Sequence, residues 1–151
     1  MESTLWEGIW DDKSGCPLIR LEFDSRNSVI RWTLQGKVTD EVFSEYIRLS
    51  AASVPKFPAK ALILDLTHAE SFDVQSRTLR DLASKAPTLP SEFPRVIVAQ
   101  SNVTYGLSRM FTILSEEQRP NSYVVRTMDE AYQLLKIRAP EFEPGALPSE
   151  R

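Results

Sequence analysis

Any Ser-His-Asp or Cys-His catalytic arrangement in this sequence must use His68, because the chain has a single histidine. His68 follows the apolar run Ala61–Leu66, and Glu70 and Asp73 lie within a few residues of it. A carboxylate beside an imidazole can orient the ring for general-base catalysis. However, the only cysteine, Cys16, lies far upstream, and the sequence contains no nucleophile elbow or Gly-rich oxyanion loop. We therefore expect His68 to make a structural hydrogen bond in a loop, and we predict no catalytic residues.

The same three side chains offer one ring nitrogen and two carboxylates to a metal ion. A structural zinc site is tetrahedral and is built mainly from Cys and His, and no second histidine is present. Acidic residues just before a helix more often stabilise its positive end. The five glycines form neither a dinucleotide fingerprint nor a phosphate-binding loop. We expect no metal and no nucleotide or other cofactor.

Composition and charge narrow the class of protein. With 151 residues, 42% of them hydrophobic and 26% charged, the chain suits one compact domain. A net charge of -3 and the lack of a basic cluster argue against nucleic acid as a partner. A single cysteine permits no internal disulfide, which suits a reducing compartment. The first residues do not form a signal peptide. No apolar run approaches the ~20 residues of a membrane span. We expect a soluble, cytoplasmic protein with no membrane span.

Hydrophobic periodicity predicts the elements that must position these residues. Strands are predicted at 18–23, 29–34, 61–66, 95–99 and 123–125. Helices are predicted to begin at Thr39 or Asp40, at Asp73, at Ser101 or Asn102, and at the capping box that opens with Thr127. Alternating strands and helices require right-handed crossovers. The predicted fold is α/β, in the order β-β-α-β-α-β-α-β-α, with a mostly parallel central sheet, an antiparallel edge hairpin and flanking helices.

The predicted domain covers residues 18–138. It is preceded by an N-terminal arm, residues 1–17, in which Trp6, Ile9 and Trp10 are expected to pack on the domain. Residues 139–151 are rich in proline and are expected to form a flexible tail.

The segment 61–83, ALILDLTHAESFDVQSRTLRDLA, resembles the central strand, loop and helix of SpoIIAA-like domains, also called STAS domains or the anti-sigma factor antagonist fold. In those antagonists the loop ends in Asp-Ser at the start of the next helix, and a kinase phosphorylates the serine. Asp73 matches the aspartate, whereas Val74 stands where the serine would be. Valine has no hydroxyl, so a phosphorylation switch at this position is excluded. Ser76 is the nearest hydroxyl, and we expect it to make an ordinary hydrogen bond at the helix start.

The second half of the chain is similar to a subset of small bacterial SpoIIAA-like proteins. The residues that carry this resemblance are Tyr105-Gly106, Arg109-Met110-Phe111 and the Thr-x-x-Glu-Ala motif at 127–131. The resemblance covers about residues 18–137 and implies a non-catalytic regulatory or protein-interaction module. The lipid-carrying SEC14 domains share the fold, so a carrier of a small lipophilic ligand is the alternative.

A binding surface is predicted at the carboxyl ends of the parallel strands, where open α/β sheets place their ligands. The loops 67–73 and 100–106 converge there and lead into the second and third helices. The predicted partner- or ligand-binding residues are His68, Glu70, Asp73, Ser76, Arg77, Tyr105 and Arg109. The partner is expected to be another protein or a second copy of this chain.

The third helix is expected to turn Leu107, Met110, Phe111 and Leu114 towards the core. Arg109 then lies on the outer side, four residues after Tyr105, where it can stack on the tyrosine ring or meet an anionic group of a partner. Gly106 costs a helix about 1 kcal/mol relative to alanine. This cost favours close approach by another backbone, a neighbouring helix or a ligand.

Overall fold

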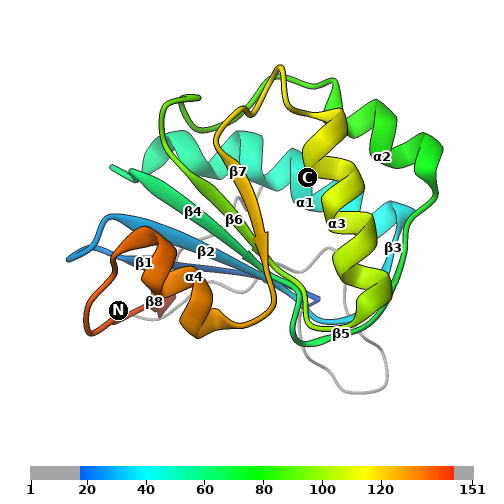
Figure 1. The fold of residues 1–151 in the computed structure, drawn as a ribbon. Helices are drawn as coiled ribbons and strands as arrows, with labels where there is room; N and C mark the ends of the chain where they lie inside the picture. Colours follow the sequence, from blue (N-terminus) through cyan, green and yellow to red (C-terminus); the bar gives the residue numbers. More distant parts are fainter. Residues whose placement is uncertain (1–17, 145–151) are drawn as a thin grey trace.

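The computed structural model describes residues 18–144, so the predicted N-terminal arm lies outside the described residues. The elements run in the order β1 (Ile19–Asp24), β2 (Val29–Leu34), β3 (Gly36–Thr39), α1 (Asp40–Ser53), a 3-10 turn (Val54–Lys56), β4 (Ala61–Asp65), β5 (Ala69–Asp73), α2 (Ser76–Ala83), β6 (Arg95–Val98), α3 (Asn102–Leu114), β7 (Ser122–Val125), α4 (Met128–Leu135) and β8 (Glu143–Pro144). Figure 1 shows α1, α2 and α3 above the central sheet and α4 on its other side.

The central sheet has six strands in the order β7-β6-β4-β2-β1-β8. Strands β2, β4, β6 and β7 are parallel neighbours, and β1 pairs antiparallel with β2 in an unbroken register from Ile19–Leu34 to Asp24–Val29. The predicted α/β fold, with a mostly parallel sheet and an antiparallel edge, is therefore confirmed. Every residue of β4 is buried, which confirms the central position predicted from its continuous apolar run.

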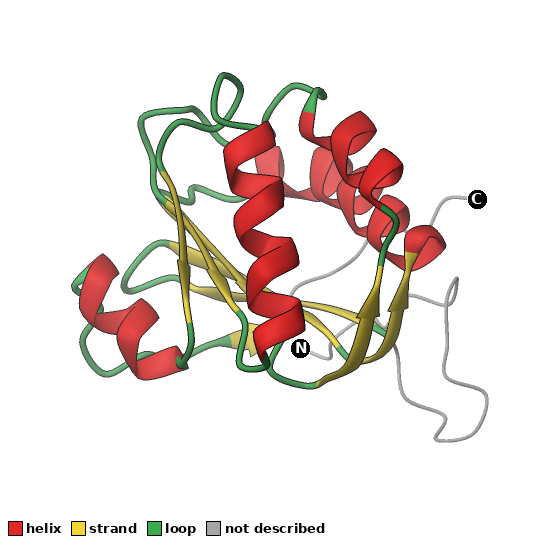
Figure 2. Cartoon of the chain, turned by 45° about the vertical axis from the view of Figure 1, so that its right-hand side comes forward, coloured by secondary structure: helices red, strands yellow, loops and turns green. Residues whose placement is uncertain are grey.

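Two hydrophobic cores lie on opposite faces of the sheet. The larger core joins α1, α2 and α3 to the sheet around the buried rings of Trp32, Phe43 and Tyr46. The smaller core joins α4 to the other face around Ile63 and Ala131. Figure 2 shows this division clearly, with α4 alone on one side of the strands. Successive side chains of a strand point to opposite faces of the sheet, so each central strand contributes apolar side chains to both cores.

A separate two-stranded parallel sheet, β3 with β5, was not predicted from the sequence. The second predicted strand ended at residue 34, and residues 67–73 were expected to form a loop. Gly36 instead takes a φ of 76°, a conformation that suits glycine, and the chain continues into β3. In the pairing of β3 with β5, Val38 lies opposite Phe72, and both side chains are buried in the larger core.

The start of α2 differs from the prediction. Asp73 is the last residue of β5 and is exposed; the helix begins at Ser76, with Gln75 in the N-cap position. Val74 lies between the two elements and is only 5% exposed. The prediction failed because β5 extends the chain through the position at which the helix was expected to begin.

The other three helix starts carry the predicted side-chain caps. Thr39 accepts a hydrogen bond from the N–H of Val42 at 3.3 Å, and Ser101 accepts one from the N–H of Thr104 at 3.1 Å. At α4, Thr127 and Glu130 cap each other's backbone N–H groups, as the capping-box pattern predicts.

The packed region extends beyond the predicted boundary at residue 138. Phe142 packs on the smaller core, where its ring lies 4.1 Å below the guanidinium of Arg31. Strand β8 then pairs with β1, and the N–H of Glu141 donates to Asp24 at 3.2 Å. The first residues of the expected flexible tail therefore belong to the domain.

Candidate functional site

The seven residues predicted for a binding surface lie on β5, α2, α3 and the turn before β5. His68, Glu70 and Asp73 are exposed in the turn and on β5, and Ser76 and Arg77 are exposed at the start of α2. On α3, Tyr105 is half-buried and Arg109 is exposed. Because α3 contacts both α2 and β5, these segments lie side by side. Within residues 18–144, however, no hydrogen bond or ion pair joins any two of the seven side chains.

His68 does not make the structural side-chain hydrogen bond expected of it with any described residue. Only its backbone carbonyl takes part, accepting a hydrogen bond from the N–H of Gly36 at 3.3 Å. Across the described part of the chain, no group of three or more metal-ligating side chains is found. No helix there is long and apolar enough to cross a membrane.

Tyr105 is stacked, but not by the arginine that the sequence suggested. The guanidinium of Arg126 lies 4.1 Å from the centre of the Tyr105 ring. Arg126 also donates to the carbonyl of Gln100 at 3.2 Å and to Asn102 at 2.9 Å, so it is fixed at the start of α3. Arg109 remains exposed to solvent. Arg126 follows β7, and α3 follows β6. Arg126 reaches the start of α3 because β6 and β7 are neighbours in the sheet, and no local sequence pattern indicates this contact.

The orientation of α3 also differs from the prediction. Phe111 is buried and Leu107 is partly buried, as expected, but Met110 and Leu114 are 36% and 38% exposed. The side that faces the domain instead carries Thr104, Ser108 and Ser115, all buried. Small side chains allow a helix to lie close to the layer beneath it. As a result, part of the apolar stripe faces solvent.

The exposed part of this stripe is continuous, and we call it the α3 face. Because successive helical residues are about 100° apart, its members fall on one side of the helix. They are Val103, Gly106, Met110, Ile113 and Leu114, with Leu107 at the inner border. Val103 and Ile113 are 68% and 62% exposed, the most open large apolar side chains in the described chain. No charged residue lies within the face, and Arg109, three residues after Gly106 and four before Ile113, borders it.

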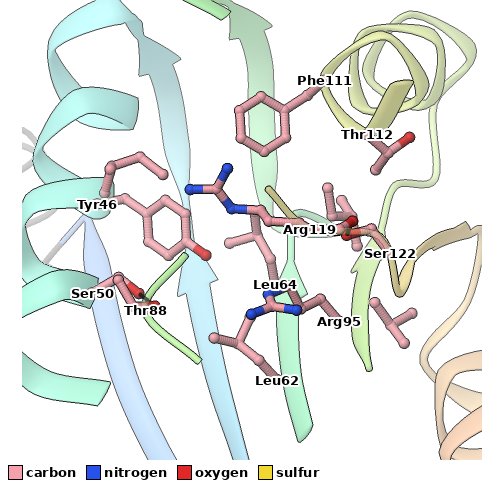
Figure 3. Close-up of a pocket in the computed structure, with 13 residues that line it drawn as sticks. Tyr46, Ser50, Leu62, Leu64, Thr88, Arg95, Phe111, Thr112, Arg119 and Ser122 are labelled. Atoms are coloured by element: carbon pink, nitrogen blue, oxygen red, sulfur yellow. Dashed lines mark hydrogen bonds between the residues drawn. The ribbon is translucent and has the colours of Figure 1, made fainter. Parts of the chain in front are cut away.

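A pocket lies on the inner side of α3, between α1, α3 and the sheet. Its lining comes from Tyr46, Ile47, Ser50, Leu62, Leu64, Thr88, Arg95, Val96, Ile97, Phe111, Thr112, Arg119 and Ser122. Figure 3 shows the guanidinium groups of Arg95 and Arg119 both pointing towards Tyr46. The side chain of Ser50 forms a hydrogen bond with Thr88 at 3.1 Å at the edge of this space.

Burial changes the electrostatics of this pocket, which we call the arginine pocket. It raises the pKa of Tyr46 to about 12, against the opposing influence of Arg119 and Arg95. Burial lowers the pKa of Arg95, and the neighbouring charge of Arg119 lowers it further. Burial likewise lowers the pKa of Arg119, which Tyr46 partly offsets. The two guanidinium groups therefore lie in an environment that disfavours positive charge.

Sequence reasoning did not find the arginine pocket. Arg95 begins the buried strand 95–99. A charged residue next to an apolar run was the one sequence feature that could have indicated a buried charge here. Arg119 lies in the polar segment after α3, which has no pattern of its own. The two meet because β6 and the return from α3 to β7 are neighbours in the fold.

No family model and no curated protein matches the sequence. Among solved structures, the chain is similar to an uncharacterized DUF3478-family protein with a SpoIIAA-like fold from Shewanella loihica PV-4, with a TM-score of 0.50, 15% identity, and coverage of 78% of this chain and 91% of that one. It also matches the anti-sigma factor antagonist SpoIIAA in its unphosphorylated form, with a TM-score of 0.48, 10% identity, and coverage of 80% of this chain and 99% of that one. The first likeness establishes that the described residues have a SpoIIAA-like fold.

Proposed function

We propose that this chain is a non-catalytic protein-interaction module, that the α3 face is its docking surface, and that a second copy of the chain occupies it. The proposal follows from the arrangement of apolar residues on α3 and not from any reactive group. A fold hosts many functions, so the SpoIIAA-like architecture alone does not assign this role.

Gly106 is the observation that carries the proposal. A Cβ at this position would meet no atom within 4 Å, and the backbone there does not have a positive φ. Neither the packing nor the conformation of this chain therefore requires a glycine. Glycine nevertheless costs the helix about 1 kcal/mol relative to alanine. Between Val103 and Met110 it leaves a low point in the apolar face, where the backbone of another helix can approach closely.

A second copy of α3 is a suitable partner for this face. In a two-fold symmetric pair the same surface meets itself, so apolar side chains contact apolar side chains. Because the α3 face carries no charged residue, two copies bring no like charges together. Arg109 is exposed and borders the face beside Ile113, so in such a pair it lies at the rim and stays in water.

The size of the face sets the expected strength of association. Only four large side chains are exposed on it, Val103, Met110, Ile113 and Leu114. Interfaces below the standard size are commonly weak or transient. We therefore expect a reversible dimer with a dissociation constant of roughly micromolar order. Phosphorylation at position 74 cannot regulate it, because Val74 has no hydroxyl.

Analytical ultracentrifugation over a wide range of protein concentrations tests the proposal. We expect the wild-type chain to pass from monomer to dimer, and Ile113→Glu to remain monomeric because it places a charge in the interface. Leu134→Glu is the matched control, because Leu134 is an exposed apolar residue of α4 on the other side of the sheet, and this variant should associate like wild type. Circular dichroism should show that both variants remain folded, since both side chains are exposed.

A wild-type chain that is monomeric at every concentration would rule out the second copy as the occupant. Association that survives in Ile113→Glu would place the contact elsewhere on the molecule.

A further inference from the structure

The arginine pocket contains two buried positive charges with no acidic partner. Arg95 and Arg119 are 7% and 8% exposed. The ion pairs formed among residues 18–144 use other arginines, namely Arg26, Arg31 and Arg48. No acidic residue is among those that line the pocket. An unpaired buried charge is costly, so this arrangement calls for a compensating group.

The hydrogen bonds of the two arginines differ. Arg95 donates to three backbone carbonyls of the preceding loop, those of Leu89, Pro90 and Phe93. It therefore fixes the loop that leads into β6. Among the described residues, the guanidinium of Arg119 makes one hydrogen bond, to the carbonyl of Ala83 at 3.2 Å, and it lies 5.6 Å from the centre of the Phe111 ring.

A guanidinium has five N–H donors, so most of those of Arg119 remain available. None of its nitrogens is among the fully buried polar atoms without a partner, so the free donors keep some accessible surface, and Arg119 is one of the residues that line the pocket. The hydroxyl of Tyr46 lies between the two guanidinium groups in the view of Figure 3, and it too has no hydrogen-bond partner among the described residues. Arg119 and Tyr46 thus offer two sets of free donors to this space, and the positive charge of Arg95 lies beside it.

The size and walls of the pocket restrict what can bind. Its volume is about 50 Å³, which is room for about four water-sized groups. The walls beside the guanidiniums are apolar and include Leu62, Leu64 and Ile97. Such a space is too small for an acyl chain, but it fits a planar anion with a short hydrocarbon substituent.

We propose that the arginine pocket binds a small organic carboxylate, whose oxygens accept hydrogen bonds from Arg119 and Tyr46 while Arg95 supplies further positive charge. A carboxylate matches the planar fork of a guanidinium and can accept two parallel hydrogen bonds. The short substituent lies against the apolar wall formed by Leu62, Leu64 and Ile97. This site lies on the inner side of α3, so it is independent of the docking face proposed above.

Titration of the ¹⁵N-labelled chain by NMR tests the site directly. The probes are sodium propionate, its neutral isostere propionamide, inorganic phosphate and sodium dodecanoate, all at constant ionic strength in chloride. We expect saturable shifts for propionate, centred on the backbone amides of Tyr46, Phe111 and Arg119. Propionamide should cause no saturable shift, because it lacks the charge.

The variant Arg119→Met keeps the contact with Phe111 but removes the charge. We expect it to bind propionate roughly 10- to 100-fold more weakly, as the loss of a charge-assisted pair predicts. Its thermal midpoint without ligand should equal or exceed that of wild type, because an unpaired buried charge has been removed. The matched control Arg80→Met, at an exposed arginine on α2, should bind propionate like wild type.

The absence of saturable shifts with propionate in the wild-type chain would overturn the proposal. Equal binding of propionate and propionamide would do the same, as would a preference for phosphate. Binding of dodecanoate alone would replace the small carboxylate with a lipid, the carrier function suggested by SEC14-like domains. None of these results depends on whether the chain dimerises.

Discussion

The carboxylate of Asp40 accepts a hydrogen bond from the backbone N–H of Gln75 at 2.8 Å, which joins the first turn of α1 to the N-cap residue of α2. The side chain of Gln75 makes no capping hydrogen bond. The segment that resembles the regulatory loop of SpoIIAA-like domains is thus held by a residue of another helix. The first N–H groups of a helix need partners from outside it, and here one comes from Asp40.

Replacing Asp40 by alanine should therefore lower the free energy of unfolding by about 1 kcal/mol, the usual value of such a hydrogen bond. Urea denaturation measures this loss. Glu41→Ala is the matched control, because Glu41 is also an acidic residue in the first turn of α1 and is exposed. Equal losses in the two variants would mean that the effect comes from the helix dipole and not from Gln75.

Replacing Val74 by serine restores the residue type that the SpoIIAA-like resemblance places there, but we expect it to destabilise the fold. Val74 is 5% exposed and belongs to the larger core. The change removes buried methyl groups and places a hydroxyl among apolar side chains, at a cost of about 1–3 kcal/mol. Denaturant unfolding provides the measurement, and Ser76→Ala, at the exposed start of α2, should change stability by less than about 0.5 kcal/mol. An unchanged stability for Val74→Ser would show that position 74 tolerates a polar group.

The parts of the fold that were predicted from sequence have local signals. The hairpin of β1 and β2 follows from strict alternation, and the caps Thr39, Ser101 and Thr127 each act on an N–H three residues away. The small sheet of β3 and β5 has no such signal. Each of its strands has one fully buried apolar side chain, Val38 or Phe72, and that is too little to distinguish a strand from a loop.

The candidate sites depend on contacts between distant segments, and sequence periodicity does not specify these. Periodicity identified an apolar stripe on α3, but not which side of the helix would face the sheet. The buried side carries Thr104, Ser108 and Ser115. Their small size lets the helix pack closely on the domain, although their polarity alone would favour exposure to solvent. In the same way, Arg95 and Arg119 form one pocket only because the segment after α3 returns beside β6.

Replacing Gly106 by alanine should have two opposite effects. The stability of the monomer should rise by about 1 kcal/mol, because alanine favours the helix and its Cβ meets no other atom. Self-association should weaken, because the added methyl group holds the second helix further away. Urea unfolding at low protein concentration measures the first effect, and sedimentation equilibrium measures the second. Unchanged association would mean that no backbone approaches Gly106, which would remove the main support for the docking face.

The buried hydroxyl of Tyr46 should make the fold sensitive to alkali. Burial raises the pKa of Tyr46 to about 12, whereas the unperturbed value, 10.0, applies once the chain unfolds. Below the lower value both states keep the proton, so this group gives no pH dependence there. Between the two values the unfolded chain releases its proton while the folded chain retains it. Stability should therefore fall with rising pH, by up to about 3 kcal/mol across this range.

Tyr46→Phe isolates this contribution, because phenylalanine keeps the ring and cannot ionise. The difference in unfolding free energy between wild type and the variant should be constant below pH 10 and should shift in favour of the variant above it. Tyr123→Phe is the control at an exposed tyrosine, and it should follow the wild-type curve. Tyr132, whose pKa is also raised by burial, is present in all three proteins and cancels in the comparison. A parallel decline in wild type and Tyr46→Phe would show that the hydroxyl of Tyr46 is not shielded from solvent by burial.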